Sequence, residues 1–591
     1  MAVFFAGRKW VSPTVISKVD DSAMAATNLD GNNIAVFIGR SEGGEPKKAI
    51  TFSSASEARQ LLRSGDLLTA IEQAFDPSAE TDGPAKMIGI RVNPAVQAES
   101  SVLDASGNTV INLKSTDYGI YTNLIKYKIE AATNDEGKKI TTQLGDDYYS
   151  GDNIKRNAFS VEYTGTGANA VMSITNTAIT MTVDNIDTVV SLSEYKTISA
   201  VVDRINAIDG FTASVLDGNG NQPALNGLDF MANFALKITT PDEREVEGED
   251  GETTTETVYI TESETAVVTA NLQACIDWLN GVYEGYLTAE RAAGAGTVPA
   301  NVNWTSLSGG SDGVVTATDW QECFDILQAE DVQWITPLSS EPAIHAMCDA
   351  HCAYMSGAGR KERRCTVGTA LGTSDEDALE AAKALNSDRT SLVHMGMFGY
   401  NAEGELELYP PYIMAAKISG AASGVTPGYS LTNRTMKIAG VERNLRNPTD
   451  TDALLEGGVI PIENRDKGYT ITQWITTWLG STKYNRREVS TGTAVDYVCR
   501  TVRSRVEDLI GGEPASPQKL KLALEIADTA LRELWRENII VGDVDNPAYR
   551  KLTGSIDGDV MRLECEVSPG IPVNYIGITV HCVPYSGTAS I

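Results

Sequence analysis

The segment from Leu307 to Leu338 has a hydrophobic pattern that predicts a glycine-rich turn, a helix and a buried strand. Four apolar residues recur at the spacing of one helical face: Trp320, Cys323, Phe324 and Leu327. Thr318 and Gln321 have the spacing of a capping box at the start of that helix. The apolar run that follows predicts a short strand, formed by Val332, Trp334, Ile335 and Leu338. Because the apolar helix face needs a sheet to pack against, we expect an α/β core here.

The same alternation of strands and helices recurs on both sides of a long insertion. Helical periods predict helices at residues 56–75, 342–355, 376–385 and 410–424, and apolar runs predict strands at 34–38, 87–92, 365–370 and 391–394. Such alternation favours a mostly parallel sheet with right-handed crossovers. We therefore expect residues 21–95 and 301–440 to form one α/β core.

Residues 96–300 differ from this core because they are rich in threonine, asparagine and glycine. Short alternating runs such as Ile125, Tyr127 and Ile129 predict an inserted β-rich surface domain, or two such domains. Seven acidic residues lie among the eleven residues from 242 to 252, where Gly248 and Gly251 interrupt them. We expect a solvent-exposed loop there, since the acids lack the spacing of a calcium-binding EF-hand loop.

Residues 441–577 are expected to form a C-terminal domain of two helices and a sheet. Helical periods cover 489–510 and 516–535, and Ser516 followed by Pro517 is typical of a helix start. Apolar runs at 560–567 and 573–583 predict the last strands. Both ends of the chain, residues 1–20 and 578–591, carry apolar strand-like sequence. The N-terminal stretch is too apolar for a solvated tail and too short to fold alone, so we expect an arm that needs a partner.

Composition narrows the possible functions. The 591 residues, with 42% apolar content, suffice for several domains. Their 79 acidic and 48 basic residues give a net charge of -31, which repels phosphate backbones and anionic lipid surfaces. Direct nucleic-acid binding and membrane insertion are therefore not expected. The opening MAVFFAGRKW has too short an apolar run for a signal peptide, and no stretch approaches the length of a transmembrane helix.

Eight cysteines are spread thinly along the chain, which indicates synthesis in a reducing cytoplasm rather than a disulfide scaffold. Cys582 is a candidate for later oxidation outside the cell. Cys348 and Cys352 are candidates for oxidation with a partner.

Residues Gly309 to Gly313 match G-x-S-x-G, the turn that presents a nucleophilic serine in some hydrolases. The surrounding pattern differs from such an elbow, because no apolar strand leads into Ser311 and the predicted helix begins only at Thr318. A triad base could come only from the four histidines of the chain, His345, His351, His394 and His581. A structural glycine turn is the favoured interpretation.

The sequence HAMCDAHC offers two imidazoles and two thiols, which on paper could bind zinc. On a helix, His345, Cys348 and Cys352 share a face, while His351 lies roughly 100° away from it. A core-facing or interface helix is therefore favoured over a metal site. No phosphate-binding loop of the G-x-x-x-x-G-K-[ST] type is present. We expect no catalytic, cofactor-binding or metal-binding residues, and hence no enzyme.

Two basic clusters stand out in this acidic chain. The first contains Arg360, Lys361, Arg363 and Arg364, and the second contains Arg486 and Arg487. They are either solvated faces that balance nearby acids or docking patches for an acidic neighbour, including another copy of this chain. Both interpretations stay open.

The order of several segments resembles the contractile phage tail sheath family, of the myovirus type. The resemblance begins with LSGGSDG, a helix containing Asp-Trp and an apolar strand that closes on proline. The other segments, which cover most of the chain outside residues 130–300, are AITFSSASEARQLLRSGDLLTAIEQAFD followed by MIGIRV, STDYGIYTNLIKYKIE, NSDRTSLVHMG, YPPYIMAAKISGAASG, LEGGVIPIENRDKGYTI, KYNRREVS, LRELWRENII and IPVNYIGITVHC. Their order is more specific than any one of them.

The resemblance implies a multidomain α+β or α/β structural protein of the virion. Such proteins assemble as stacked hexameric rings around a tail tube and contract to drive the tube through the host envelope for genome ejection. Terminal arms add strands to the C-terminal domain of neighbouring copies. The expected partners are further copies, the tube protein, and baseplate, neck and terminator proteins. The residues expected to make inter-subunit arm contacts are Val3, Phe4, Phe5, Val15, Ile16, Ile578, Val580 and Cys582.

Two other functions stay open on the sequence alone. One is the sheath of a cellular contractile injection system, which has the same architecture. The other is a secreted or virion-borne hydrolase or binding protein with a β insertion.

Overall fold

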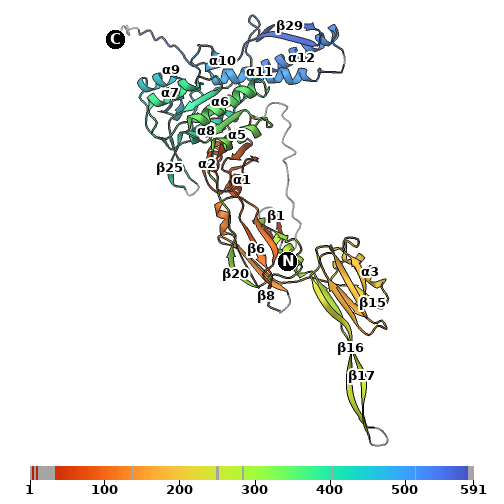
Figure 1. The fold of residues 1–591 in the computed structure, drawn as a ribbon. Coiled ribbons are helices and arrows are strands. Elements are labelled where there is room, and N and C mark those ends of the chain that lie inside the picture. The colour runs from red at the N-terminus through yellow and green to blue at the C-terminus, as the bar shows by residue number, and fades with distance from the viewer. Residues whose placement is uncertain are drawn as a thin grey trace. The chain divides into compact units, whose positions relative to one another are not determined.

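The computed structural model describes residues 3–5, 8–10, 33–134, 137–247, 252–281, 285–401, 404–512, 514–582 and 587. The chain divides into two compact units (Figure 1). The first unit contains Met1–Ser41, Lys47–Asn93 and Val315–Ile591, and the second contains Glu42–Pro46 and Pro94–Val314. The fold is a mixed α/β, multidomain one, as the sequence predicted.

A six-stranded sheet forms the centre of the first unit. Its strand order is β23-β22-β21-β3-β5-β4. All neighbours pair in parallel except β4, which runs antiparallel to β5 at one edge. The strands are β3 (Ala35–Gly39), β4 (Ala49–Phe52), β5 (Met87–Arg91), β21 (Trp334–Pro337), β22 (Arg364–Gly368) and β23 (Thr390–Val393). The predicted mostly parallel sheet is confirmed.

Helices cover both faces of this sheet, so its strands are apolar on both sides. One face packs against α1 (Ala55–Leu62), α2 (Asp66–Phe75) and α8 (Pro411–Ser423). The other face packs against α5 (Ala317–Ile326), α6 (Pro342–Ser356) and α7 (Asp375–Leu385). Successive residues of β3 alternate between the two cores, with Phe37 in the first and Val36 and Ile38 in the second.

The helix α5 begins differently from the prediction. The prediction of a capping box at Thr318 and Gln321 is wrong, because Thr316 is the N-cap and Asp319 its partner. The Asp319 carboxylate accepts hydrogen bonds from the backbone N–H of Thr316 at 2.7 Å and from its hydroxyl at 2.6 Å. Asp319 also pairs with Lys47 at 2.8 Å. A carboxylate can satisfy the helix start and bind a cation at once, which a glutamine amide cannot.

The segment between the sheet and the last helices adds small elements around α8. They are β24 (Met397–Tyr400), β25 (Leu406–Tyr409), β26 (Gly440–Val441), α9 (Thr449–Glu456), β27 (Ile462–Arg465) and β28 (Gly468–Ile471). Trp474, Ile460 and Ile471 join the same core as α8. This cover explains why α8 is apolar almost all round and buried along its whole length.

The C-terminal part of the first unit contains α10 (Tyr484–Arg487), α11 (Val489–Glu507), α12 (Pro517–Arg536), β29 (Tyr549–Asp557) and β30 (Val560–Val567). Ser516 caps α12 as predicted, because its hydroxyl accepts from the backbone N–H of Lys519 at 3.2 Å. A small core joins the two long helices to the following loop through Ala494, Val498, Leu531, Leu534, Ile539, Ile540 and Ala548. The strand predicted at 560–567 is confirmed.

The second unit is rich in β-structure, and its described residues form four sheets. Their orders are β10-β9-β8-β20, β15-β11-β18, β14-β13-β12-β16-β17 and β19-β7-β6. The elements are β6 (Glu99–Leu103), β7 (Thr109–Ser115), β8 (Lys126–Ala131), β9 (Lys138–Leu144), β10 (Asp147–Ile154), β11 (Asn157–Tyr163), β12 (Ala170–Ile174), β13 (Ala178–Val183), β14 (Ile186–Ser191), α3 (Ile198–Asn206), β15 (Phe211–Val215), β16 (Met231–Glu247), β17 (Thr253–Ser263), β18 (Ala266–Thr269), α4 (Asn271–Gly281), β19 (Leu287–Arg291) and β20 (Val302–Ser306). Two separate apolar cores hold these sheets, one around α3 and one around α4.

Within the described residues of both units, none of the helices combines the length and the apolar character that a bilayer crossing requires.

Candidate assembly surfaces

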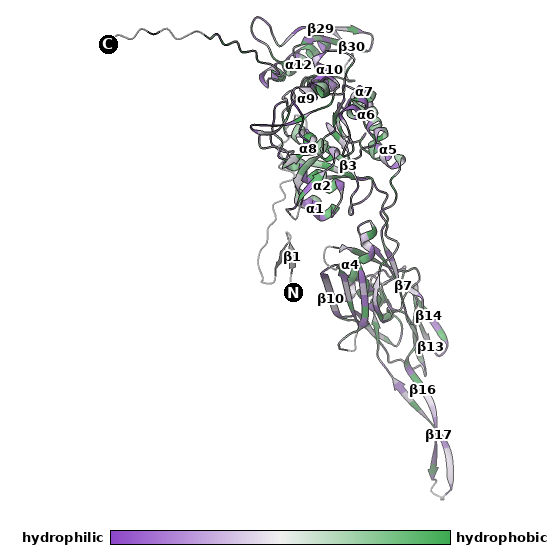
Figure 2. Cartoon of the chain, turned by 90° about the vertical axis from the view of Figure 1, so that its left-hand side faces the viewer, coloured by the Kyte–Doolittle hydropathy of each residue, from purple (hydrophilic) through white to green (hydrophobic). Residues whose placement is uncertain are grey.

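The segment after β30 is extended and has no strand partner among the described residues. Figures 1 and 2 show it leaving the C-terminal domain as an isolated chain. Its apolar side chains are largely in solvent: Tyr575 is 86% exposed, Ile578 81% and Val580 76%. Exposed apolar side chains and unpaired backbone groups together mark a segment that needs a partner.

The strand predicted at 573–583 is therefore wrong for the described part of that range, residues 573–582. The apolar alternation is present, but a strand forms only when another strand supplies hydrogen bonds. Several contacts fix the base of the segment, including a hydrogen bond from the Gly570 N–H to the Ile539 carbonyl at 3.0 Å. Pro569 forms an isolated bridge with Ile540, and the Asn574 amide donates to a carboxylate oxygen of Glu488 at 2.7 Å. We call residues 571–582 the C-terminal tail.

The hairpin β29–β30 offers the backbone groups that such a tail lacks. It is a two-stranded sheet, so each strand has one edge without a strand neighbour among the described residues. One face rests on α12, where the Tyr549 hydroxyl donates to Asp528 at 2.6 Å. Open strand edges accept further strands by backbone hydrogen bonding.

The N-terminal region contains two described strands, β1 (Val3–Phe5) and β2 (Arg8–Trp10). They pair with each other in antiparallel register, with Val3 opposite Trp10. Three of the residues expected to make contacts, Val3, Phe4 and Phe5, thus lie on a strand. The other two, Val15 and Ile16, lie outside the described residues.

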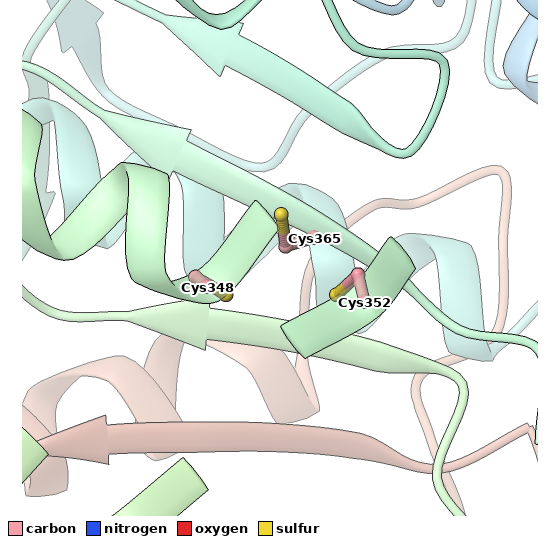
Figure 3. Close-up of side chains that lie close together, drawn as sticks. All are labelled: Cys348, Cys352 and Cys365. Carbon is pink, nitrogen blue, oxygen red and sulfur yellow. The ribbon is translucent and has the colours of Figure 1, made fainter. Parts of the chain in front are cut away.

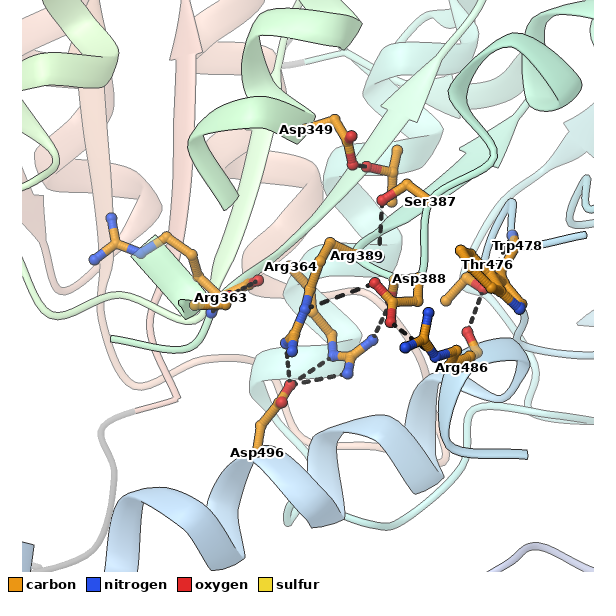
Figure 4. Close-up of polar contacts among 12 residues, drawn as sticks. Asp349, Arg363, Arg364, Ser387, Asp388, Arg389, Thr476, Trp478, Arg486 and Asp496 are labelled. Atoms are coloured by element: carbon orange, nitrogen blue, oxygen red, sulfur yellow. Dashed lines mark hydrogen bonds and ion pairs between the residues drawn. The ribbon is translucent and has the colours of Figure 1, made fainter. Parts of the chain in front are cut away.

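A network of buried and partly buried ions joins α11 to the parallel sheet (Figure 4). Asp496 of α11 accepts from Arg364 of β22 at 2.9 Å and from Arg389, which precedes β23, at 2.7 Å. The side chains of Arg364 and Asp496 are 5% and 14% exposed. Gly492 lies one turn before Asp496, and a methyl group there would meet the Arg364 guanidinium at 2.3 Å. The absence of a side chain at Gly492 therefore lets Arg364 reach α11.

The two basic clusters serve mainly internal contacts rather than free docking patches. Arg363 and Arg364 are buried. The Lys361 ammonium donates to the carbonyls of Gln328 and Ala329 at 3.1 and 2.8 Å, at the C-terminal end of α5. Arg487 donates to the Leu455 carbonyl at 2.8 Å.

In the second cluster, Arg486 stacks on Trp478, with its guanidinium 4.6 Å from the ring centroid (Figure 4). Arg360 is the most exposed member of the first cluster and lies 3.9 Å from Glu507. Three of these residues balance nearby acids, as one interpretation of the sequence had it: Arg360 pairs with Glu507, Arg364 with Asp496 and Arg486 with Asp388. Arg363 and Arg364 are buried, however, and not on a solvated face.

The strands β16 and β17 continue beyond their sheet as a two-stranded ribbon (Figure 2). The loop predicted around residues 242–252 is wrong for residues 242–247, which belong to β16. Each of these residues pairs with a threonine, glutamate or valine of β17, for example Glu243 with Thr257. The β-branched threonines of β17 favour a strand and separate the acids. The residues of β17 are exposed to solvent, as the sequence predicted for this region.

The turn with the G-x-S-x-G pattern belongs to the second unit. Ser311 forms an isolated antiparallel bridge with Val96, whose N–H donates to the Ser311 carbonyl at 2.8 Å. The Asn123 amide donates to the Gly310 carbonyl at 2.8 Å. The backbone of this turn therefore ties two distant segments of the second unit together, and the following helix begins at Ala317.

The residues of HAMCDAHC lie on α6, and the structure separates the histidines from the cysteines. His345 Nε2 lies 2.8 Å from the Ser339 carbonyl, and His351 Nε2 lies 3.1 Å from the Arg363 guanidinium. Burial and the charge of Arg363 lower the pKa of His351 to about 4. Cys348 and Cys352 instead meet Cys365 of β22, and all three sulfur atoms lie within 4.8 Å of one another (Figure 3).

The thiols of this cluster differ electrostatically. Burial raises the pKa of Cys348 and of Cys365 well above the ordinary value. Burial opposes ionisation at Cys352 too, but hydrogen bonds from the other two thiols and the charge of Arg363 lower its pKa to about 5. All eight cysteines are free thiols, and Cys582 on the C-terminal tail is exposed.

No family model matches this sequence. The tail sheath protein of Bacillus phage SP01 is 28% identical over 609 residues, which cover 99% of this chain and 98% of that protein. The tail sheath protein of Staphylococcus phage Twort is 24% identical over 513 residues, covering 84% of this chain and 85% of that protein. The crystal structure of a sheath tail protein from Desulfitobacterium hafniense covers 95% of this chain and 96% of its own, with a TM-score of 0.55 and 13% identity.

The structural likeness supports a common fold. The resemblance to the contractile phage tail sheath family, first indicated by the order of sequence motifs, is confirmed by these relatives.

Proposed function

We propose that this chain is the structural subunit of a contractile phage tail sheath. One observation carries the proposal: in a chain similar from end to end to phage tail sheath proteins, an apolar tail stands unpaired although the C-terminal hairpin has open edges. A soluble monomer has no use for such a tail, whereas a polymer built by strand exchange requires one.

In this proposal, the C-terminal tail of one copy adds a strand to the β29–β30 hairpin of a neighbour. Ile578, Val580 and Cys582 make the contacts on that side. The N-terminal arm, with Val3, Phe4, Phe5, Val15 and Ile16, contributes on the other. Each backbone hydrogen bond contributes only about 0.5–1.5 kcal/mol net, but the bonds of one strand act together. The lattice therefore stays connected while subunits move.

Contraction itself is proposed to exchange contacts between rigid bodies while the donated strands persist. Copies assemble as stacked hexameric rings around a tail tube in an extended form. After a trigger from the baseplate they rotate, move outward and pack more tightly, which drives the tube through the host envelope for genome ejection. A gain of a few kcal/mol per subunit, summed over many copies, supplies mechanical work without a nucleotide.

The same proposal assigns the parts of the chain and their partners. The arms are residues 1–20 and 578–591, the α/β core 21–95 and 301–440, the β-rich insertion 96–300, and the C-terminal domain 441–577. Partners are other copies, the tube protein, and the baseplate, neck and terminator proteins. The protein is made in the host cytoplasm and resides in the virion, where Cys582 of the exposed tail is the thiol best placed for later oxidation.

Negative-stain microscopy of two purified chains tests the proposal. The full chain should form striated tubes of uniform width, and a variant that ends at residue 574 should stay a folded monomer. The circular dichroism spectrum and melting temperature should be equal for both, because Asn574 is kept and the removed apolar side chains that the structure describes, from Tyr575 to Val580, are exposed. Normal tubes from the shortened chain would refute strand donation by the tail. If the full chain forms no tubes, even after a baseplate fraction is added to nucleate assembly, the sheath function itself is refuted.

A further inference from the structure

Three cysteines that are distant in sequence converge inside the α/β core of the first unit. Cys348 and Cys352 are one helical turn apart on α6 and point toward β22, which carries Cys365 (Figure 3). Each residue is at most 1% exposed. Because their sulfur atoms lie within 4.8 Å of one another, a point between them lies at most about 2.8 Å from each sulfur. Zinc–sulfur bonds are about 2.3 Å long, so small side-chain rotations close the difference.

A buried cation lies beside this cluster without a carboxylate of its own. Arg363 is 1% exposed, and its guanidinium donates to the carbonyls of Leu327 and Glu330, both at 2.9 Å. Its other contacts are the Lys361 carbonyl and the His351 ring, and none of the ion pairs among the described residues includes it. Buried charges are normally paired. Arg363 stands two residues before Cys365, and its guanidinium contacts the ring of His351, which directly precedes Cys352. The structure thus places three sulfur ligands next to a compensating positive charge.

We propose that Cys348, Cys352 and Cys365 bind one thiophilic, closed-shell metal ion in an all-sulfur site. Soft thiolate ligands select zinc and monovalent copper among biological metals. Three thiolates with Zn²⁺ carry one net negative charge, which the single charge of Arg363 balances. Three thiolates with Cu⁺ carry two negative charges, but three-coordinate sulfur ligation suits this ion well. In both cases each thiol releases its proton to solvent as its sulfur–metal bond forms.

Such an ion would fasten α6 to the parallel sheet. The helix packs on β22 through the same face that carries Cys348 and Cys352. A bound ion therefore raises the free energy of unfolding of the core, independently of any assembly into tubes.

The probes are Zn²⁺ and, without oxygen, Cu⁺, each offered from a coloured chelator. The parent is the full chain with Cys499, Cys565 and Cys582, the three exposed thiols, changed to serine. We expect the parent chain to take one equivalent of at least one of the two ions from the chelator, and its melting temperature to rise. Cys365→Ala should lower the affinity at least about 100-fold, since it removes a direct ligand.

Cys323→Ala is the matched control, because Cys323 is an equally buried thiol on α5 outside the cluster. It should keep the stoichiometry and the shift in melting temperature. If Cys365→Ala does not fold, Cys348→Ala takes its place. The proposal is overturned if neither ion passes to the parent chain, or if the cluster variants and Cys323→Ala bind equally.

Discussion

Proline substitutions in the C-terminal tail test strand donation one hydrogen bond at a time. Ile578 is 81% exposed, and a methyl group added at Gly577 meets no atom within 4 Å. Ile578→Pro and Gly577→Pro should therefore leave the isolated chain unchanged. In a paired strand, proline removes an N–H donor and leaves the acceptor of the neighbouring copy unsatisfied. That loss costs about 1–3 kcal/mol per subunit.

The concentration of free subunits in equilibrium with tubes measures this cost. A loss of about 1–3 kcal/mol raises that concentration by a factor of about 5–150. Sedimentation of assembled samples, followed by assay of the supernatant, gives the value. Ile578→Thr and Gly577→Ala are the matched controls, because both keep the N–H group, and both should assemble within about threefold of the native chain.

The two neighbouring positions also report how the tail pairs. Successive N–H groups of a strand point to opposite sides. If the tail becomes an edge strand, only one of the two prolines should impair assembly. If it lies between two strands, both should. Native supernatant concentrations for both proline variants would refute the reasoning.

Other predictions concern the first unit and the thiols. Asp496→Ala leaves the buried Arg364 without its carboxylate and should lower the free energy of unfolding by about 3–5 kcal/mol in urea titrations, whereas the exposed Asp545→Ala should change it by less than about 0.5 kcal/mol. Burial lowers the pKa of Lys417 to about 8, below its unfolded value of 10.5. The buried charge therefore lowers the free energy of unfolding fully below pH 8, and this destabilisation disappears as the pH rises from 8 to 10.5. Lys417→Met should accordingly be more stable by roughly 3 kcal/mol at pH 7 and show no such gain above pH 10; an equal gain at both pH values would contradict this origin. In the unassembled, folded chain, a thiol reagent should modify the exposed Cys499, Cys565 and Cys582 quickly, and the five buried cysteines only when the chain unfolds. Assembly into tubes should slow the modification of Cys582. Equal rates for Cys582 before and after assembly would argue against its place in the subunit contact.

The parallel sheet was predictable because its strands are short apolar runs buried on both faces, separated by helices with a clear apolar period. The start of α12 was predictable for a local reason, since Ser516 and Pro517 specify a helix start without help from distant residues. The start of α5 was harder to predict, because the choice between Thr316 and Thr318 depends on Asp319. The carboxylate of Asp319 pairs with Lys47, which is distant in the sequence.

Long-range pairing explains the remaining differences. The acids of β16 were expected in a loop because their charge favours solvent, but pairing with the threonines of β17 keeps them in solvent and in a strand. The C-terminal tail has the alternation of a strand and yet pairs with no strand among the described residues of its own chain. The approach of Cys365 to Cys348 and Cys352 depends on how α6 packs against β22, which no local pattern of the sequence contains.

The most direct test of the account is a cryo-electron microscopy reconstruction of the assembled tubes in which each chain can be traced to its end. The account predicts that residues 571–582 of every copy run as a strand alongside the β29–β30 hairpin of a neighbouring copy. A reconstruction in which each tail folds back onto its own chain, with no strand shared between copies, would contradict it.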